Sequence, residues 1–596
     1  MTEKEISWDL TRIYTSPSDP KIDEDMKKLL DTAKEMKSKY KGKINVPNFT
    51  NQNLLALLKE IEELNANVDE IELFTMNTFN ANMTIQENQN LKNKFDAFRT
   101  SISKTLAFLS LELGELIKNK QEFITDPILA NYKHYLQKLL KEHEHKLSEI
   151  EEQIILEKDQ HGIKAWQQLQ ATWLNTRKFK VMVENKEKIL SYGEANSLLT
   201  HPDRETRISA NRSIYGGLGK DQEIYSSALR NICADWINMV KRRKYKSPMH
   251  HSLIVNDVSE EIINNLMETI KKNVNVYQKY LKLKAKLLNL PKLSCADILA
   301  PLPFEPEKKY SWEEAKQLIL EAYGNFDEEF KNFVEKMFDE NNIDASIRVG
   351  KRNGAYCATW FKNKSALILM SYTGTVKEIF TLIHELGHAI HAHLSTSNQT
   401  YLNIHPGYCV SETASIFGEL LLTDLLLEKM ASKEDKMSIL AHVLDDVGQA
   451  AFQVSARVWF EQRLYEAVRK GEHLSGEVIA KYWTQSRDEI YGDSVDWFEE
   501  MKWEWAMKPH YYLTKLRFYN YPYVFAQLFV YTLYGKYKPG KEDFKNRFKE
   551  LLSSGGSKST IELAKIMGLD ITDKKFWNTG IKQIGEFVSE LEKLSS

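Results

Sequence analysis

The stretch His384-Glu385-Leu386-Gly387-His388 is the most informative part of this sequence. On an α-helix, residues four positions apart lie one turn apart on nearly the same face. His384 and His388 can therefore approach one metal ion together, and Glu385 can reach a water molecule beside it. His and Glu also occur by chance on solvated helices, so the neighbouring sequence decides how the pentapeptide is interpreted.

The residues before the pentapeptide predict a rigid setting for it. The run from Ala366 to Tyr372 is short, bulky and apolar, which is typical of a buried strand. Thr375-Val376-Lys377-Glu378 then has the Ser/Thr-x-x-Glu pattern of a helix capping box. A helix that begins there carries an apolar stripe, which consists of Ile379, Leu382, Ile383, Leu386 and Ile390. We expect the pentapeptide to lie within a capped, half-buried helix.

A catalytic zinc site usually has three protein ligands, so a third is needed. Glu412 follows a His-Pro-Gly turn and begins another predicted helix. Glu419 lies on the same face two turns later and is a candidate acceptor for the second ring N–H of a ligand histidine. Alternatives stay open: Glu412 could be a solvated carboxylate stabilised by the helix dipole, and Glu419 an ordinary surface charge. The sequence predicts one Zn²⁺ per chain, held by His384, His388 and Glu412.

With the pentapeptide, the apolar run before it and Glu412 in this order, the sequence resembles the oligoendopeptidase F family, which comprises M3-type zinc metallopeptidases related to thimet oligopeptidase. The resemblance extends over nearly the whole chain. Glu412-Thr413-Ala414-Ser415 matches the family segment that carries the third zinc ligand. The other matching segments are Trp8–Thr11, His201–Arg207, Gly350–Cys357, Leu367–Met370, Ser554–Ser557 and Phe576-Trp577.

The resemblance also implies residues that contact the substrate. A family stretch near the C-terminus supplies His and Tyr donors, and here it implies catalytic roles for His510, Tyr519 and Tyr523 and a substrate contact for Tyr521. Phenol and imidazole donors can stabilise an oxyanion, although such aromatic residues more often pack in a core. Many relatives have a tyrosine where Gln527 aligns, so one donor can be missing here.

A second substrate contact is expected from Gly354, Ala355 and Tyr356, because they lie close in sequence to the predicted strand near Leu367. That strand could pair with the main chain of an extended peptide.

The composition excludes several classes of protein. Lys plus Arg number 81 against 83 Asp plus Glu, so no global field favours nucleic acid or an anionic membrane. Four cysteines without paired spacing suit a reducing compartment rather than a disulfide framework. The N-terminus lacks an apolar signal core, and no apolar run approaches the roughly 20 residues that span a bilayer. We expect a cytoplasmic protein with no nucleic-acid or membrane partner, and the oligomeric state stays open.

With only 14 prolines and 25 glycines among 596 residues, and abundant Leu, Lys and Glu, the sequence predicts a mainly α protein. Residues 132–157 are expected to form one long packed helix, and Ile189–Tyr192 a strand. A polar turn near His201 predicts an N-terminal helical domain of residues 1–200 and a catalytic domain of residues 201–596. The resemblance implies a two-lobed zincin-type helical body with a deep substrate channel and a small β-sheet beside the zinc helix.

The hypothesis that follows is a zinc metalloendopeptidase of the oligoendopeptidase F type. Glu385 would act as general base on a metal-activated water, and the substrates would be short, unfolded peptides. Two other hypotheses stay open: a zinc hydrolase of a non-peptide amide, and a helical scaffold whose zinc site is inactive.

Overall fold

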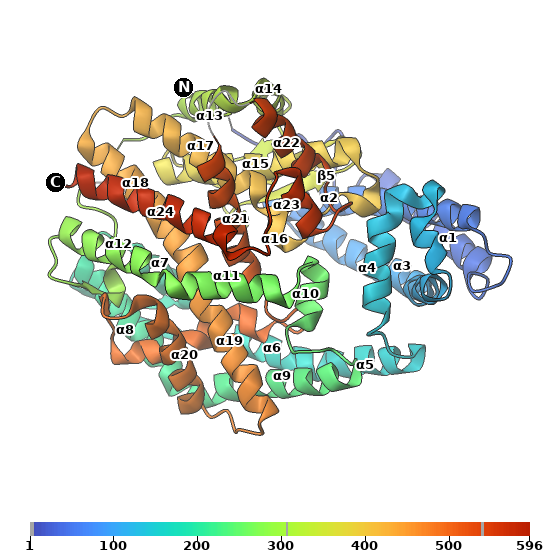
Figure 1. Ribbon diagram of the computed structural model, residues 1–596, viewed down its shortest axis with the longest axis horizontal. Helices are drawn as coiled ribbons and strands as arrows, with labels where there is room; N and C mark the ends of the chain where they lie inside the picture. Colours follow the sequence, from blue (N-terminus) through green and yellow to red (C-terminus); the bar gives the residue numbers. More distant parts are fainter. Residues whose placement is uncertain (1–4, 305–307, 538–541) are drawn as a thin grey trace. The chain divides into compact units, whose positions relative to one another are not determined.

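The computed structural model describes residues 5–304, 308–537 and 542–596 (Figure 1). Helices account for most of these residues and strands are few and short, so the prediction of a mainly α protein is confirmed. In these described ranges, no helix is both long and apolar enough to cross a bilayer. All four cysteines are free thiols.

The chain forms two compact units, and each gathers segments that are far apart in the sequence. Unit 1 comprises Met1–Glu144, Lys308–Leu425 and Tyr537–Asp570, and unit 2 comprises the remaining three segments. This division by contacts differs from the predicted boundary near residue 200, which lies inside unit 2. Sequence domains and compact units are different divisions, so the domains 1–200 and 201–596 stay a prediction.

Unit 1 is built from long amphipathic helices around a small mixed sheet. Its helices are α1 (Pro20–Tyr40), α2 (Asn51–Ala81), α3 (Gln86–Asn119), α4 (Lys133–His143), α13 (Trp312–Phe326), α14 (Glu328–Asp339), α15 (Val376–Asn398), α16 (Tyr408–Ser411), α22 (Glu542–Ser553), α23 (Thr560–Ile566) and most of α17 (Thr413–Lys429).

The sheet of unit 1 lies against the helix that carries the pentapeptide. Its strands are β4 (Ile343–Asp344), β5 (Tyr356–Trp360) and β6 (Ser365–Leu369), in the order β4-β6-β5. β6 is fully buried and central, pairing in parallel with β4 and antiparallel with β5. Both β5 and β6 pack against α15, so the prediction of a small sheet beside the zinc helix is confirmed.

Unit 2 is also helical. Its helices are α5 (Glu149–His161), α6 (Ile163–Thr176), α7 (Tyr192–Ser197), α8 (Arg204–Lys220), α9 (Gln222–Arg242), α10 (His250–Asn256), α11 (Glu260–Lys272), α12 (Val274–Leu287), α18 (Lys433–Val447), α19 (Val454–Arg469), α20 (Gly476–Tyr491), α21 (Tyr521–Lys536) and α24 (Lys574–Leu594). Its strands are β1 (Lys178–Val183), β2 (Lys186–Ser191), β3 (Leu293–Ser294) and β7 (Val495–Asp496). The strand predicted at Ile189–Tyr192 corresponds to β2.

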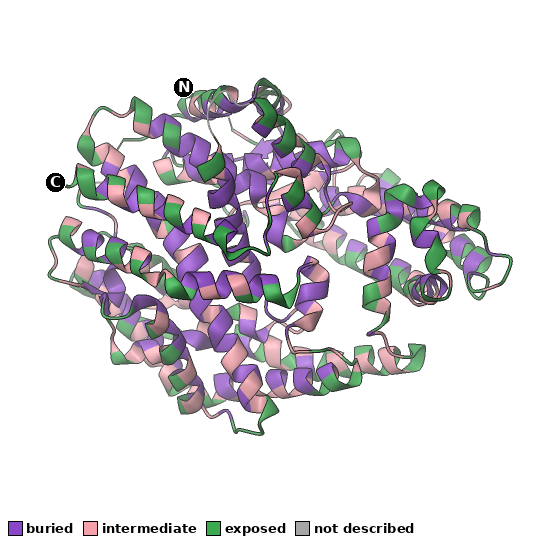
Figure 2. Ribbon diagram, in the orientation of Figure 1, coloured by how far each residue is buried: buried purple, intermediate pink, exposed green. Residues whose placement is uncertain are grey.

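The prediction of one long helix over residues 132–157 was wrong. The first half is α4, which ends at His143, and the second half is α5, which begins at Glu149. Ser148 stops a continuous helix because its side chain caps α5 in a capping box with Glu151. None of the residues of α5 is buried (Figure 2), and Ile150 is 70% exposed, so the second half of the predicted packed helix does not pack.

Candidate metal centre

The helix α15 begins where its sequence predicts. The Thr375 side chain accepts a hydrogen bond from the Glu378 main chain, and the Glu378 side chain accepts one from Thr375 in return. All five residues of the predicted apolar stripe are buried. This packing fixes the rotation of α15 about its axis, and the two histidines of the pentapeptide therefore project from a rigid element.

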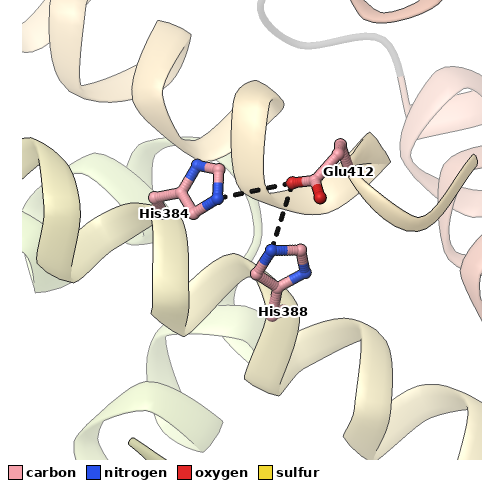
Figure 3. Close-up of side chains that lie close together, drawn as sticks. All are labelled: His384, His388 and Glu412. Atoms are coloured by element: carbon pink, nitrogen blue, oxygen red, sulfur yellow. Dashed lines mark ion pairs between the residues drawn. The ribbon is translucent and has the colours of Figure 1, made fainter. Parts of the chain in front are cut away.

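A glycine inside the pentapeptide lets a second helix come close. A Cβ atom on Gly387 would lie 2.5 Å from both the carbonyl oxygen of Ala414 and the Cα atom of Ser415. Only hydrogen can occupy that space, so α15 approaches the first turn of α17 at main-chain contact. Glu412 lies at the junction of α16 and α17, and this close approach places its carboxylate over the two histidines (Figure 3).

The three predicted ligands come together. Oε2 of Glu412 lies 3.3 Å from Nε2 of His384 and 3.1 Å from Nε2 of His388 (Figure 3). The three donor atoms all lie within 4.8 Å of one another. Ligand atoms around a tetrahedral zinc ion lie about 3.4 Å apart, given metal–ligand bonds of about 2.1 Å. The spacing and the donor set of two imidazoles and one carboxylate thus fit a zinc ion.

Neighbouring side chains orient the imidazole of His384 and the carboxylate of Glu412 by hydrogen bonds. Nδ1 of His384 contacts Oε1 of Glu419, so Nε2 of the same ring faces Glu412. The Ser415 hydroxyl donates to Oε2 of Glu412 at 2.9 Å. Burial opposes the charged form of His384, but the carboxylates of Glu412 and Glu419 outweigh burial and raise its pKa well above the usual value.

The carboxylate of Glu385 is buried beside the ligands, and burial raises its pKa, although His384 and His388 oppose the rise. Burial raises the pKa of the Cys357 thiol on β5, and the negative charge of Glu385 raises it further. β5, the strand that carries Cys357, packs against α15, the helix that carries Glu385.

An open groove of about 530 Å³ runs along β5. One side is formed by residues 356–362, and the others by α2 and by the segment from Tyr401 to His405. In the described part of the chain, β5 has a partner strand on one side alone, which is β6. Gly354 lies in an exposed bend before β5, and Ala355 between them is half-buried. The Tyr356 hydroxyl donates to the side-chain oxygen of Asn77 at 2.7 Å.

The predicted aromatic donors form a cluster within unit 2. The ring of His510 lies 5.4 Å from that of Tyr519 and 6.1 Å from that of Tyr523, and the two tyrosine rings lie 5.6 Å apart. All three residues are partly exposed. Burial, with Arg457 and Lys508 nearby, lowers the pKa of His510 to about 4, so its ring is neutral at pH 7.

Tyr521 does not fit its predicted role as a substrate contact. It is fully buried, and its hydroxyl donates to the main-chain oxygen of Ser252 at 3.0 Å and accepts from Asn256 at 3.0 Å. Tyr521 is the first residue of α21, and this position turns the side chain into the core of unit 2 rather than toward Tyr519 and Tyr523. Sequence spacing alone did not separate the buried tyrosine from the two partly exposed ones.

Comparisons with known proteins identify the family to which this chain belongs. Residues 197–583 match the profile of peptidase family M3, and residues 118–179 match the profile of Oligopeptidase F. Oligoendopeptidase F, chromosomal, of Lactococcus lactis subsp. cremoris is 26% identical over 598 residues, which cover 99% of this chain and 97% of that protein. Oligopeptidase PepF of Bacillus subtilis (strain 168) is 26% identical over 511 residues, which cover 85% of this chain and 76% of that protein.

A solved structure shows the same fold. The crystal structure of oligoendopeptidase-F from Enterococcus faecium has a TM-score of 0.71 at 21% identity, covering 96% of this chain and 99% of that one. Together these matches place the chain among the metallopeptidases. It belongs to peptidase family M3, which is a family of zinc metallopeptidases, and the predicted resemblance to oligoendopeptidase F is confirmed.

Proposed function

We propose that this protein is a zinc-dependent endopeptidase that hydrolyses internal bonds of short, unfolded peptides. The observation that carries the proposal is the convergence of His384, His388 and Glu412 beside the buried carboxylate of Glu385. The family supports metallopeptidase activity, and the finer assignments below are our own.

The three converging residues would hold zinc, and Glu419 would fix the ring orientation of His384. When bound, zinc supplies a Lewis acid that polarises water and the scissile carbonyl. Glu385 accepts the proton of the attacking water and passes it to the leaving amine. Its burial favours this role, because a carboxylate with a raised pKa is a stronger base.

The groove along β5 would bind the substrate main chain. An extended peptide can add to the free edge of β5 as a further strand, with its side chains pointing alternately into the groove and away from it. Gly354, Ala355 and Tyr356 would form one end of this binding surface. The same strand packs against α15, the helix that carries Glu385, which supports placing the scissile bond along β5.

The cluster of His510, Tyr519 and Tyr523 would donate hydrogen bonds to the oxyanion that forms during attack. A neutral His510 can donate one ring N–H, and each tyrosine can donate its hydroxyl. This assignment rests on the chemistry of the cluster and on the family resemblance. The free cysteines suit a reducing compartment, so we place the activity in the cytoplasm.

Digestion of a peptide mixture tests the proposal. Peptides of about 5 to 30 residues, which span different lengths at about 3.3 Å per residue, are incubated with the protein with and without a chelator. We expect internal cuts in the short peptides that the chelator abolishes, and none in a folded control protein. No cuts by zinc-loaded protein would contradict the peptidase assignment and favour an inactive scaffold or a non-peptide amide as substrate.

A further inference from the structure

The turn that precedes α21 presents Tyr519 between two buried neighbours. Phe518 and Asn520 are buried, whereas Tyr519 is partly exposed. Phe518 has a φ of +53°, in the left-handed region that bulky residues rarely adopt. Such a conformation persists only where the surrounding structure holds it. The position of Tyr519 therefore depends on whatever holds Phe518.

Two residues of α19 hold Phe518. The Glu461 carboxylate accepts a hydrogen bond from the main-chain N–H of Phe518 at 2.8 Å. Tyr465, one turn later on α19, packs its ring 5.2 Å from that of Phe518. On the other side, the Ser252 hydroxyl of α10 donates to the main-chain oxygen of Phe518 at 3.1 Å. Buried side chains thus satisfy both main-chain polar groups of this residue.

Glu461 is an unusual residue to find in a core. It is 2% exposed, and burial raises its pKa to about 7, while the Phe518 N–H, Arg517 and Asn520 oppose the rise. All three of these opposing groups belong to the turn. Burying a carboxyl group costs free energy unless the group is hydrogen-bonded. Here the Glu461 carboxyl group accepts its hydrogen bond from the turn, at the main-chain N–H of Phe518.

We propose that Glu461 is a positioning residue for the reaction: it fixes the turn at Phe518 and so places the Tyr519 ring beside those of His510 and Tyr523. Glu461 itself touches none of the reacting atoms. The inference rests on the proposed function, because it assigns a purpose to the position of Tyr519. It adds to that function a residue from a helix outside the metal-binding sequence.

Steady-state kinetics of four variants test the inference, with circular dichroism to verify folding. Glu461→Leu leaves the Phe518 N–H without its acceptor, and we expect kcat to fall on the order of 10-fold to 100-fold with KM nearly unchanged. Glu461→Gln keeps an acceptor oxygen and is expected to stay within about threefold of wild type. Ser252→Ala removes the other anchor and should also lower kcat. Glu466→Leu, an exposed carboxylate on the same helix, is the matched control and should have no effect.

A double variant separates positioning from a general loss of stability. If Glu461 acts through Tyr519, then Glu461→Leu should have little further effect in a Tyr519→Phe background. Equal losses in both backgrounds, or full activity of Glu461→Leu or Tyr519→Phe, would overturn the inference while leaving wild-type peptidase activity intact. Absence of chelator-sensitive cleavage by the wild type would instead remove the proposed function, and the inference with it.

Discussion

Replacing Gly387 with alanine tests how the metal site is assembled. The added Cβ would meet the carbonyl oxygen of Ala414 and the Cα atom of Ser415 at 2.5 Å. Both are main-chain atoms of a packed helix start, so no flexible side chain can move away. An ordinary carbon contact needs about 3.4 Å or more, and α15 and α17 must therefore separate locally by about 0.9 Å.

The separation matters because Glu412 lies two residues before Ala414 and would move with it. Ligand positions in a metal site tolerate shifts of only about 0.2 Å. We expect the zinc affinity of Gly387→Ala to fall by about 10-fold to 100-fold or more, comparable to the loss of a residue that orients a ligand. Overpacking should also lower the stability by about 1–3 kcal/mol, partly offset by the better helix propensity of alanine.

Zinc affinity is measured by competition with a chromophoric chelator, together with peptide hydrolysis at saturating zinc. Gly585→Ala is the matched control, since this helical glycine has only an ordinary contact at 3.9 Å from its added Cβ. We expect that variant to bind zinc like the wild type. Wild-type zinc affinity and activity in Gly387→Ala would refute the argument that main-chain contact between α15 and α17 sets the position of Glu412.

Three further predictions concern carboxylates. Glu412→Gln should lose zinc, because a neutral amide oxygen is a weaker ligand; unchanged metal content by elemental analysis would remove Glu412 from the ligand set. Glu419→Gln should bind zinc about 10-fold to 100-fold more weakly by chelator competition, because the acceptor that orients His384 loses its charge; wild-type affinity would make Glu419 dispensable. For Glu461, whose pKa is raised from 4.5 to about 7, the native state holds a proton that the unfolded chain loses, so wild-type stability should fall as pH rises through that window. The free energy of unfolding of Glu461→Gln, measured from melting curves, should therefore rise relative to that of the wild type by up to about 3 kcal/mol between pH 4.5 and 7. A difference in unfolding free energy that does not change with pH would contradict the buried, protonated state.

The convergence of the proposed metal ligands could be predicted from the sequence because much of their geometry is local. The capping box at Thr375 and the apolar stripe fix α15, and a spacing of four residues then places His384 and His388 on one face. The match of Glu412 to a family segment supplied the candidate for the third ligand. The reason that Glu412 reaches the histidines is not local, since it depends on Gly387 and on the close approach of two helices.

The environments of Tyr521 and Phe518 depend on contacts between segments that are far apart in the chain, so the sequence pattern did not predict them. The burial of Tyr521 follows from its hydrogen bond to Ser252, which is far away in the sequence. The left-handed conformation of Phe518 and its bond to Glu461 are likewise invisible in a pattern of apolar residues. The break between α4 and α5 is different, because it has a local signal in the sequence, the capping box of Ser148 and Glu151.

The most direct test of the central claim compares the wild type with Glu385→Gln in two measurements on the same preparations. Zinc content is determined by elemental analysis, and cleavage of internal peptide bonds by mass spectrometry. We predict equal zinc content, close to one ion per chain, and a loss of hydrolysis by about 10²-fold or more, because the general base is gone while the ligands remain. Hydrolysis at the wild-type rate by zinc-loaded Glu385→Gln would contradict the assignment of this site as the catalytic centre.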